Sequence, residues 1–537
     1  MTDPGSAPAA EPVLGRFWLP GSADVVVHGQ LTLGGEGPRL RLDGSLTPAM
    51  KPAESSTVAE ESAACAFVDT NWEDEPSLTI HGDVVSGAPS ESVTLIDGFT
   101  TGRTFDWAGW KVGPGVGQQR LQARYAVLGG HIAGDEEVFT GVRMRLRHLD
   151  EWAGLGGFGH SLAVDHASIT FQRPIMPPAA LSNGSLLHVD QDLSWARDGD
   201  SEKLTRVVWL RVDGHPPARW PELDRSLVTP LVTLLTLAVD ADCAPVQVEL
   251  AAGTDTGWLS LSSSGLSPPV ERPRPAREML LPLQALGLTA VAAWLDRVED
   301  LGPLPPVVAA AVAKPPLTLE TGLLELATVA EGLARRLWPE WNRFSRDEVG
   351  RAQPGVDEPD EVDRARPSAL AAVAEHGETM SAAVKGALEH LHEPSCPQRL
   401  EKLAQYAGDA VPGVLGRLTE QGRPSRWKEA VVGARIDFAH RIDQGWLNEA
   451  SVDRYLALYN SLRWLLTGVL LLETGLEPKP SARGCVSTSG TTYSSDKPDS
   501  VATKGLRLKS RSFACAHHTL IVERSTIPLR TTERGQS

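Results

Sequence analysis

The sequence predicts a multidomain α+β protein, with a β-rich, sandwich- or barrel-like N-terminal region followed by an all-α helical bundle. Three observations support this prediction. Short segments of alternating apolar and polar residues, separated by Gly- and Pro-containing turns, recur over residues 14–290. Longer amphipathic segments rich in Leu and Ala replace them over residues 316–476. A chain of 537 residues is also long enough for two or three hydrophobic cores.

The composition, with 41% hydrophobic and 22% charged residues, is that of an ordinary globular protein. A net charge of -17 argues against a nucleic-acid coat protein or a membrane-surface protein, but it permits a small local cationic site. The N-terminus has no signal-peptide pattern, and the longest apolar run, residues 465–472, is too short to span a bilayer. Five scattered cysteines without a CxxC pair indicate reduced thiols. We therefore expect a cytoplasmic protein that does not contact a membrane.

The β-rich region, residues 14–290, follows a polar segment, residues 1–13, that is predicted to be disordered. Its first two strand pairs share a pattern, because VVVHGQLTLGG with RLRLDGSL is followed by SLTIHGDVV with SVTLIDGF. The shared HG and DG dipeptides suggest a loosely repeated two-hairpin unit, although turn chemistry alone often yields both. A Pro-rich stretch near residue 175 could divide the region into two lobes. Further strands are predicted in QRLQARYAVLGG, EEVFTGVRMRL, ASITFQRPI, KLTRVVWLRV and APVQVELAAG, and a buried helix in LVTPLVTLLTLAV.

A cluster of five prolines predicts a linker over residues 291–315, and helices are predicted beyond it. Beyond residue 476 neither period persists, and residues 477–537 carry ten Lys/Arg against five Asp/Glu, so we expect a disordered basic tail with one possible strand at HTLIVERS. The predicted helices of the 316–476 bundle are TLETGLLELATVAEGLARRLWPEW, RPSALAAVAEHGETMSAAVKGALEHLHE, PSCPQRLEKLAQYAG, PSRWKEAVVGARIDFAHRIDQGW and NEASVDRYLALYNSLRWLLTGVLLLETG.

The most informative motif lies in the helix that contains ARIDFAHRID. Val431 and Phe438 belong to one apolar line of this helix, and Arg435 interrupts that line. A guanidinium on a core-facing stripe is costly unless an anion or a polar cavity meets it. Five residues later comes His440, whose side chain titrates near neutral pH. An arginine that holds a phosphate and a histidine that moves a proton are the groups that phosphodiester cleavage requires.

The spacing of this motif does not by itself bring the two groups together. Five residues rotate about 140° around an ideal helix, so Arg435 and His440 converge only if the arginine wraps around the helix or a partner chain supplies one group. Asp437 could orient His440 or Arg441, which lie three and four residues further along. Arg441 could also contribute to substrate binding. In the alternative interpretation Arg435 simply pairs with a carboxylate in the core.

The other candidate residues have ordinary structural interpretations. Histidines and cysteines at EHLHEPSC and near Cys515 match no common zinc spacing, so we expect no metal and no cofactor. Glu325 and Glu331 could reach an active-site arginine, but helix-face glutamates are more often solvated. Scattered basic residues usually serve solubility, and tryptophans usually lie in the core. The residues concerned are His390, His392, Cys396, His517 and His518; Arg335, Arg336, Arg417 and Arg441; and Trp18, Trp72, Trp107, Trp110 and Trp152.

Taken together, the chain resembles the ApeA family of bacterial antiphage proteins, which join an ApeA-type N-terminal domain to a C-terminal HEPN domain. The N-terminal resemblance rests on GRFWLPG, on VHGQLTL and TIHGDV with SVTLIDGF, and on FTGVRMRLRHLDEW at residues 139–152. The C-terminal resemblance rests on the helix order, on Arg435 and His440, and on a Leu-rich last helix that ends in LLETGL. Together these phrases extend over residues 14–476.

The resemblance implies a metal-independent endoribonuclease that causes abortive infection by cleaving host RNA, with tRNA as the expected class. It implies a homodimer or larger homo-oligomer in which the R-x4-H helices face each other, and an unknown phage trigger acting through the β-rich domain. Arg435 would hold the scissile phosphate and His440 would transfer a proton. The family usually has a polar residue directly after the arginine, whereas this chain has Ile436 and then Asp437. The alternative is a non-catalytic HEPN dimerisation or sensor protein whose β domain binds a phage or host ligand.

Overall fold

The computed structural model divides the chain into two compact units. The β unit comprises Met1–Ala218, Pro245–Pro273 and Ser487–Ser537, and the helical unit comprises Arg219–Ala244 and Arg274–Val486. This arrangement confirms the predicted α+β class. The structure describes residues 11–34, 36–47, 50–52, 67–69, 76–85, 90–104, 117–132, 138–162, 167–198, 201–253, 257–270, 272–341, 393–410, 423–440, 449–476 and 522–523.

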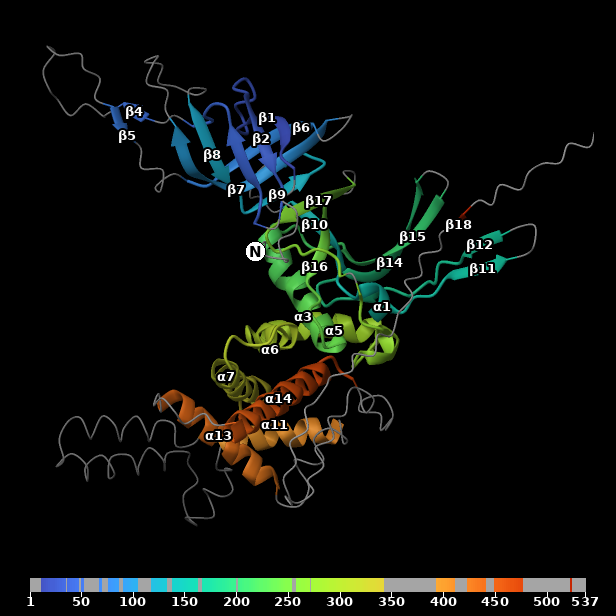
Figure 1. Ribbon diagram of the computed structural model, residues 1–537, viewed down its shortest axis with the longest axis vertical. Helices are drawn as coiled ribbons and strands as arrows, with labels where there is room; N and C mark the ends of the chain where they lie inside the picture. Colours follow the sequence, from blue (N-terminus) through green and yellow to red (C-terminus); the bar gives the residue numbers. More distant parts are fainter. Residues whose placement is uncertain are drawn as a thin grey trace, which may run out of the picture. The chain divides into compact units, whose positions relative to one another are not determined.

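A closed six-stranded barrel forms the first part of the β unit (Figure 1, blue). Its strands follow the order β1-β2-β3-β8-β7-β6, and antiparallel pairing of β6 with β1 closes the ring. Alternate residues of each strand point inward, as the alternating sequence pattern predicts, and residues such as Phe17, Leu31 and Ile80 are completely buried. The strands are β1 (Val13–Trp18), β2 (Val27–Thr32), β3 (Arg39–Leu42), β6 (Leu78–Val85), β7 (Glu91–Thr104) and β8 (Gln118–Gln122).

The remaining long strands extend the sheet from β7 through β9, β17, β16, β10, β15 and β14 to β13. Strands from before and after residue 175 therefore pair within one continuous sheet. Trp152 of the short helix α1 (Leu149–Ala153) is completely buried, as expected for a core tryptophan. The strands are β9 (Tyr125–Leu128), β10 (Phe139–Leu146), β13 (Ala179–Ala180), β14 (Leu186–Asp198), β15 (Ser201–Asp213), β16 (Pro245–Ala252) and β17 (Trp258–Ser263); β4 (Met50–Pro52) pairs with β5 (Phe67–Asp69), β11 (Phe158–Leu162) with β12 (Ala167–Phe171), and β18 (Val522–Glu523) with β15.

The HG dipeptides do not mark turns. Gly29 lies inside β2 and Gly82 inside β6, the two strands that flank β1. Gly82 pairs with Phe17 of β1, and a Cβ atom at Gly82 would lie 2.5 Å from the Phe17 ring. The interpretation of these dipeptides as turn signals was therefore wrong at both positions. Glycine is needed at position 82 because the Phe17 ring occupies the space that a side chain would fill, and at position 29 because a Cβ atom would lie 2.5 Å from the Arg41 carbonyl oxygen.

The helical unit includes a segment from within the β-rich part of the sequence, because α3 (Thr229–Val239) belongs to the helical unit. This helix is buried, as predicted from LVTPLVTLLTLAV. Helices α5 (Leu288–Leu301) and α6 (Leu304–Ala313) occupy the stretch that was predicted to be a Pro-rich linker. That prediction was wrong because Pro305 and Pro306 lie in the first turn of α6, where a helix needs no N–H donor from them. The preceding short elements are α2 (Trp220–Leu223), the π-helix η2 (Asp224–Val228), the 3-10 helix η3 (Ala276–Glu278) and α4 (Leu283–Leu286).

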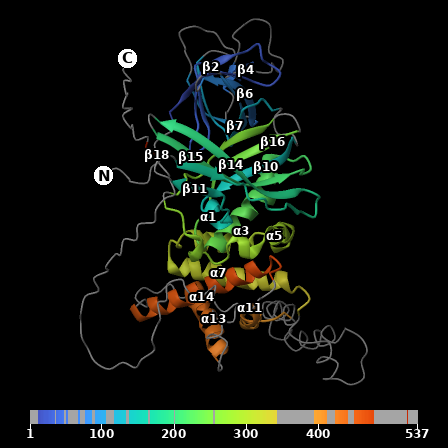
Figure 2. The same cartoon turned by 90° about the vertical axis from the view of Figure 1, so that its right-hand side faces the viewer.

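Four predicted helices of the bundle are present, and α14 packs against α7, α11 and α13 (Figures 1 and 2). The Thr318 side chain caps the N-terminus of α7 by accepting from the Thr321 N–H. The helix predicted over RPSALAAVAEHGETMSAAVKGALEHLHE and almost all of the predicted tail lie outside the described residues. The helices are α7 (Leu319–Leu337), α11 (Cys396–Ala410), α13 (Arg423–His440) and α14 (Glu449–Leu472).

One stretch of α14, Val452–Leu472, is long and apolar enough to cross a membrane by length and composition. Half of it is buried within the protein, as in the core helix of a globular domain. Its buried residues include Leu462, Leu465 and Leu466, all completely shielded from solvent.

Candidate functional site

Arg435 lies on α13 at the margin of the buried side of the helix. Val431 and Ala434 of α13 are buried, and Phe438 packs against Tyr455 of α14 with 4.7 Å between the ring centroids. The Arg435 side chain remains 36% exposed. The side chain therefore lies at the bundle surface and is partly open to solvent.

Glu331 of α7 is the carboxylate that meets this arginine. Nη1 of Arg435 donates to Oε2 of Glu331 at 2.8 Å, and the Glu331 side chain is only 21% exposed. The expectation that Glu331 is a solvated helix-face charge was wrong, because α13 packs against α7 and brings the guanidinium to it. Glu325, six residues earlier on α7, is exposed as expected.

Arg399 of α11 binds the other oxygen of the same carboxylate. Its Nη1 donates to Oε1 of Glu331 at 3.1 Å, and its Nη2 donates to Glu393 at 2.8 Å. Arg399 is 4% exposed, and the two carboxylates compensate its buried charge and accept from both of its terminal nitrogens. Arg335 of α7 lies 3.0 Å from Glu393 at the exposed edge of the cluster. Three arginines and two glutamates leave one positive charge in excess.

The Cys396 thiol completes this cluster at the first residue of α11. It forms a hydrogen bond with Arg435 and is affected by the charges of Glu331 and Arg399. Burial raises the pKa of the Cys396 thiol, the Glu331 carboxylate raises it further, and Arg435 partly opposes both. The cysteine is therefore held as a neutral thiol beside the arginine rather than as a thiolate nucleophile or metal ligand.

The pKa of Arg435 is raised above its ordinary value. Burial of the guanidinium acts against its charge, but the neighbouring Glu331 and Cys396 outweigh burial. Glu331 and Cys396 each accept one hydrogen bond from the guanidinium, so the arginine retains further N–H donors, and part of its side chain is open to solvent. Such a permanently charged, anchored group can bind a phosphate oxygen.

Only some of the other predicted site residues lie among the described residues. Asp437 is half-buried on α13, two residues beyond Arg435, and Ile436 is 52% exposed. His440 is the last residue of α13, but its side chain lies outside the described residues, as does all of Arg441. The arginine and histidine of the motif are thus placed on one helix, and the distance between their side chains is not part of the described structure.

Sequence reasoning missed Arg399 altogether and considered Cys396 only as a metal ligand. The spacing of Glu331 and Arg335, four residues apart on one helix face, was a local signal of a charge cluster. Nothing local connects either residue to Arg435, which lies 104 residues beyond Glu331. The pairing depends on how α7, α11 and α13 pack.

The remaining candidates contribute no second centre in the described part of the chain. No cluster of three His, Cys, Asp or Glu residues there could hold a metal ion. Arg336 donates to the backbone oxygen of Asp300 rather than lining a site. Trp18 is only partly buried and packs edge-on against His81 and His131. The candidates that lie outside the described residues are His390, His392, Arg417, Cys515, His517, His518, Trp72, Trp107 and Trp110.

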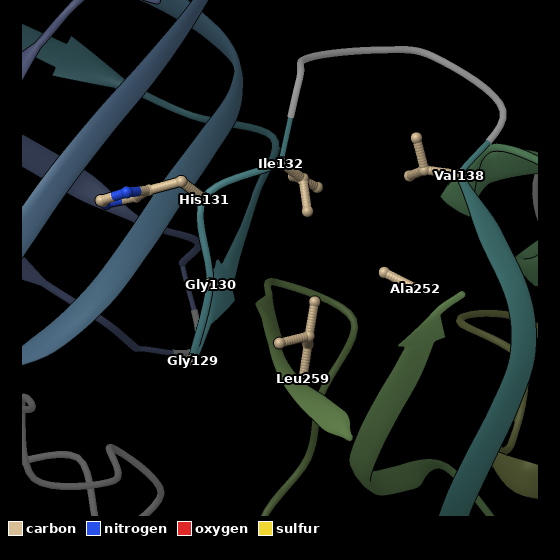
Figure 3. A pocket seen from close by; sticks show the side chains of 7 residues that line it. All are labelled: Gly129, Gly130, His131, Ile132, Val138, Ala252 and Leu259. Carbon is tan, nitrogen blue, oxygen red and sulfur yellow. The ribbon is translucent and has the colours of Figure 1, made fainter. Parts of the chain in front are cut away.

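A pocket of about 400 Å³ in the β unit offers little chemistry (Figure 3). Side chains of Ile132, Val138, Ala252 and Leu259 surround it, whereas His131 points away from it. The imidazole of His131 instead lies 3.1 Å from the Gly82 carbonyl oxygen. Among the described residues that line it, the pocket is an apolar hollow, and none of them directs a titratable group into it.

Comparison with known proteins identifies the β-rich region. Residues 12–295 match the family model described as ApeA N-terminal domain 1. No curated protein and no solved structure matches the chain. The matched region covers the barrel and extended sheet and also includes α3, the pocket and most of α5. Because the match spans more than half of the chain, this protein belongs to the ApeA family and, through it, to the proteins of antiphage defence.

Proposed function

We propose that this protein is an abortive-infection effector whose helical unit is a metal-independent HEPN endoribonuclease. Its substrate is host RNA, with tRNA as the expected class, and its activity is triggered by a phage component through the β-rich domain. The observation that carries the proposal is the anchored yet partly solvent-open Arg435, on the helix that also carries His440. The proposed enzyme requires no metal or cofactor and acts in the cytoplasm.

The chemistry assigned to the motif is an internal transesterification. The ribose 2′-oxygen attacks the adjacent phosphorus, the P–O5′ bond breaks, and the products are a 2′,3′-cyclic phosphate and a 5′-hydroxyl. Arg435 stabilises the charge that develops on the phosphoryl oxygens. His440 removes the 2′-hydroxyl proton or protonates the leaving 5′-oxygen. Asp437 orients the histidine, and Arg441 contributes to RNA binding.

A homodimer supplies the geometry that one helix lacks. Arg435 and His440 are separated by about 140° around α13, so two facing copies of this helix would let one protomer's arginine serve the other's histidine. Ile436, directly beside Arg435, is 52% exposed, and an exposed apolar side chain there suits such a contact.

A second candidate function has its own support. The Arg435–Glu331 ion pair is also what a purely structural arginine would form, and Ile436 occupies the place where the family usually has a polar residue. In this alternative the helical unit only dimerises, and the β domain binds a phage or host ligand. The two functions differ in whether replacement of Arg435 abolishes RNA cleavage or only weakens the fold.

The test is to incubate wild type, Arg435→Ala and His440→Ala with total bacterial tRNA in the presence of a chelator, and to map the product ends. Arg426→Ala is the matched control, because Arg426 is an exposed arginine of the same helix. Cleavage by wild type and the control alone, leaving cyclic phosphates, supports the ribonuclease. Equal cleavage by Arg435→Ala would exclude it. The same proteins expressed during phage infection report whether toxicity follows cleavage.

A further inference from the structure

The carboxylate of Glu331 is divided between two arginines from different helices. One oxygen accepts from Arg435 at 2.8 Å and the other from Arg399 at 3.1 Å. The two arginines differ in burial, because the Arg399 side chain is 5% exposed and that of Arg435 is 36% exposed. Glu331 therefore connects an interior cation to one that faces solvent.

Arg399 fixes the position of Glu331 independently of Arg435. If Glu331 rotated away, the buried Nη1 of Arg399 would lose its acceptor, and a buried donor without an acceptor costs free energy, so Arg399 holds Glu331 in place. Glu393 holds the opposite side of the Arg399 guanidinium at 2.8 Å, which restricts the arginine as well. The Glu331 oxygen that faces Arg435 is thus held in place from behind.

A fixed carboxylate could either block an anion site or orient the cation that forms it. A blocking carboxylate has to leave when the anion binds, but departure of Glu331 would leave the buried Nη1 of Arg399 without its acceptor. The Arg435–Glu331 contact also uses a single nitrogen of Arg435. The Cys396 thiol accepts a second hydrogen bond from Arg435, and the other donors of the guanidinium stay available to an anion. These contacts favour orientation over blockade.

We propose that Glu331 is a positioning residue for Arg435, held in turn by the buried Arg399, so that the free side of the Arg435 guanidinium faces the phosphate of a bound RNA. This inference rests on the proposed ribonuclease function for its substrate. It assigns roles to two residues that lie outside the R-x4-H motif. The contacts run from Arg399 on α11 through Glu331 on α7 to Arg435 on α13.

The primary test is Glu331→Gln, which preserves the shape of the side chain but gives two arginines one neutral acceptor. At saturating RNA we expect kcat to fall on the order of 10²-fold, because a misplacement of about 1 Å costs that much. KM should change much less, because Arg435 stays positively charged and loses a competing anion. Glu325→Gln is the matched control, because Glu325 is an exposed glutamate of the same helix, and it should cleave as wild type.

A second measurement does not depend on cleavage. Phenylglyoxal modifies the neutral form of arginine, and labelling of Arg435 can be followed by mass spectrometry of its peptide. Loss of the Glu331 charge both releases Arg435 and removes a group that raises its pKa, so labelling should accelerate about tenfold for each unit by which the pKa falls. The release of Arg435 and the fall in its pKa both increase the labelling rate. Glu325→Gln should label at the wild-type rate.

The outcomes separate this inference from the proposed function. Wild-type kcat in Glu331→Gln, or unchanged Arg435 labelling, would overturn the positioning role. If wild type cleaves no RNA either in vitro or when expressed during phage infection, the proposed function fails, while faster labelling in Glu331→Gln still supports the contact between Glu331 and Arg435. Should Glu331→Gln not fold, Glu331→Asp is the second variant. It keeps a negative charge beside Arg399, but its side chain is one methylene too short to contact both arginines. It should then show the same loss in kcat.

Discussion

Arg463 of α14 donates to the carboxylate of Asp240 at 2.7 Å, although 223 residues separate them in the chain. Asp240 ends α3 in the left-handed conformation, with φ 58°, and Arg274 donates to it as well. Since the ApeA N-terminal domain 1 match includes α3, the family-defined region contributes a helix to the core of the helical unit. The boundary of the matched sequence is therefore not a boundary between folded units.

Asp240→Ala should destabilise the helical unit by about 3–5 kcal/mol, because it leaves two poorly exposed arginines without their shared carboxylate. The measurement is urea unfolding followed by the helical circular-dichroism signal. Asp300→Ala removes an exposed partner of Arg297 and should cost at most about 1 kcal/mol. Equal losses in the two variants would show that the Asp240 cluster does not stabilise the unit.

Gly82→Ala should destabilise the barrel by about 1–3 kcal/mol, because the added Cβ atom would lie 2.5 Å from the Phe17 ring and force it to move. Thermal unfolding of the full chain, monitored by near-ultraviolet circular dichroism, measures the effect. Gly102→Ala is the control, because Gly102 lies in strand β7 of the same barrel with open space around its Cβ position. An unchanged midpoint for Gly82→Ala would contradict the close packing of β1 against β6.

The fold was predictable where local patterning decides the structure. Alternation located most of the strands, and Leu content located α3 and the later helices. The same local reasoning failed at α6, since the prolines that suggested a linker lie in its first turn, and at Gly82, where a ring from another strand requires glycine. At the candidate site it found Arg435 but not its partners, because Glu331 and Arg399 reach the arginine only through helix packing.

Tyr406 should make stability fall at high pH. Burial, and then the bond from its hydroxyl to Glu473 at 2.8 Å, raise the pKa of Tyr406 from 10 to about 12. Because the pKa is higher in the folded than in the unfolded protein, Tyr406 contributes its full stabilisation of the folded state below pH 10. This stabilisation is lost as the pH rises from 10 through about 12. The unfolding free energy of wild type minus that of Tyr406→Phe should thus be constant below pH 10 and decline between pH 10 and 12. A constant difference throughout that interval would contradict the assignment.

Cys396 should report directly on the charge of Arg435. Burial and then Glu331 raise the pKa of the thiol, whereas Arg435 lowers it, so Arg435→Met should raise the pKa further. The rate at which iodoacetamide alkylates Cys396, followed by peptide mass spectrometry across pH, should therefore show its midpoint at higher pH in Arg435→Met than in wild type. Arg426→Met, which removes an exposed arginine from the same helix, should leave the midpoint in place. A midpoint that falls in Arg435→Met would mean that the guanidinium does not lie against the thiol, and the cluster around Glu331 would then have to be arranged differently.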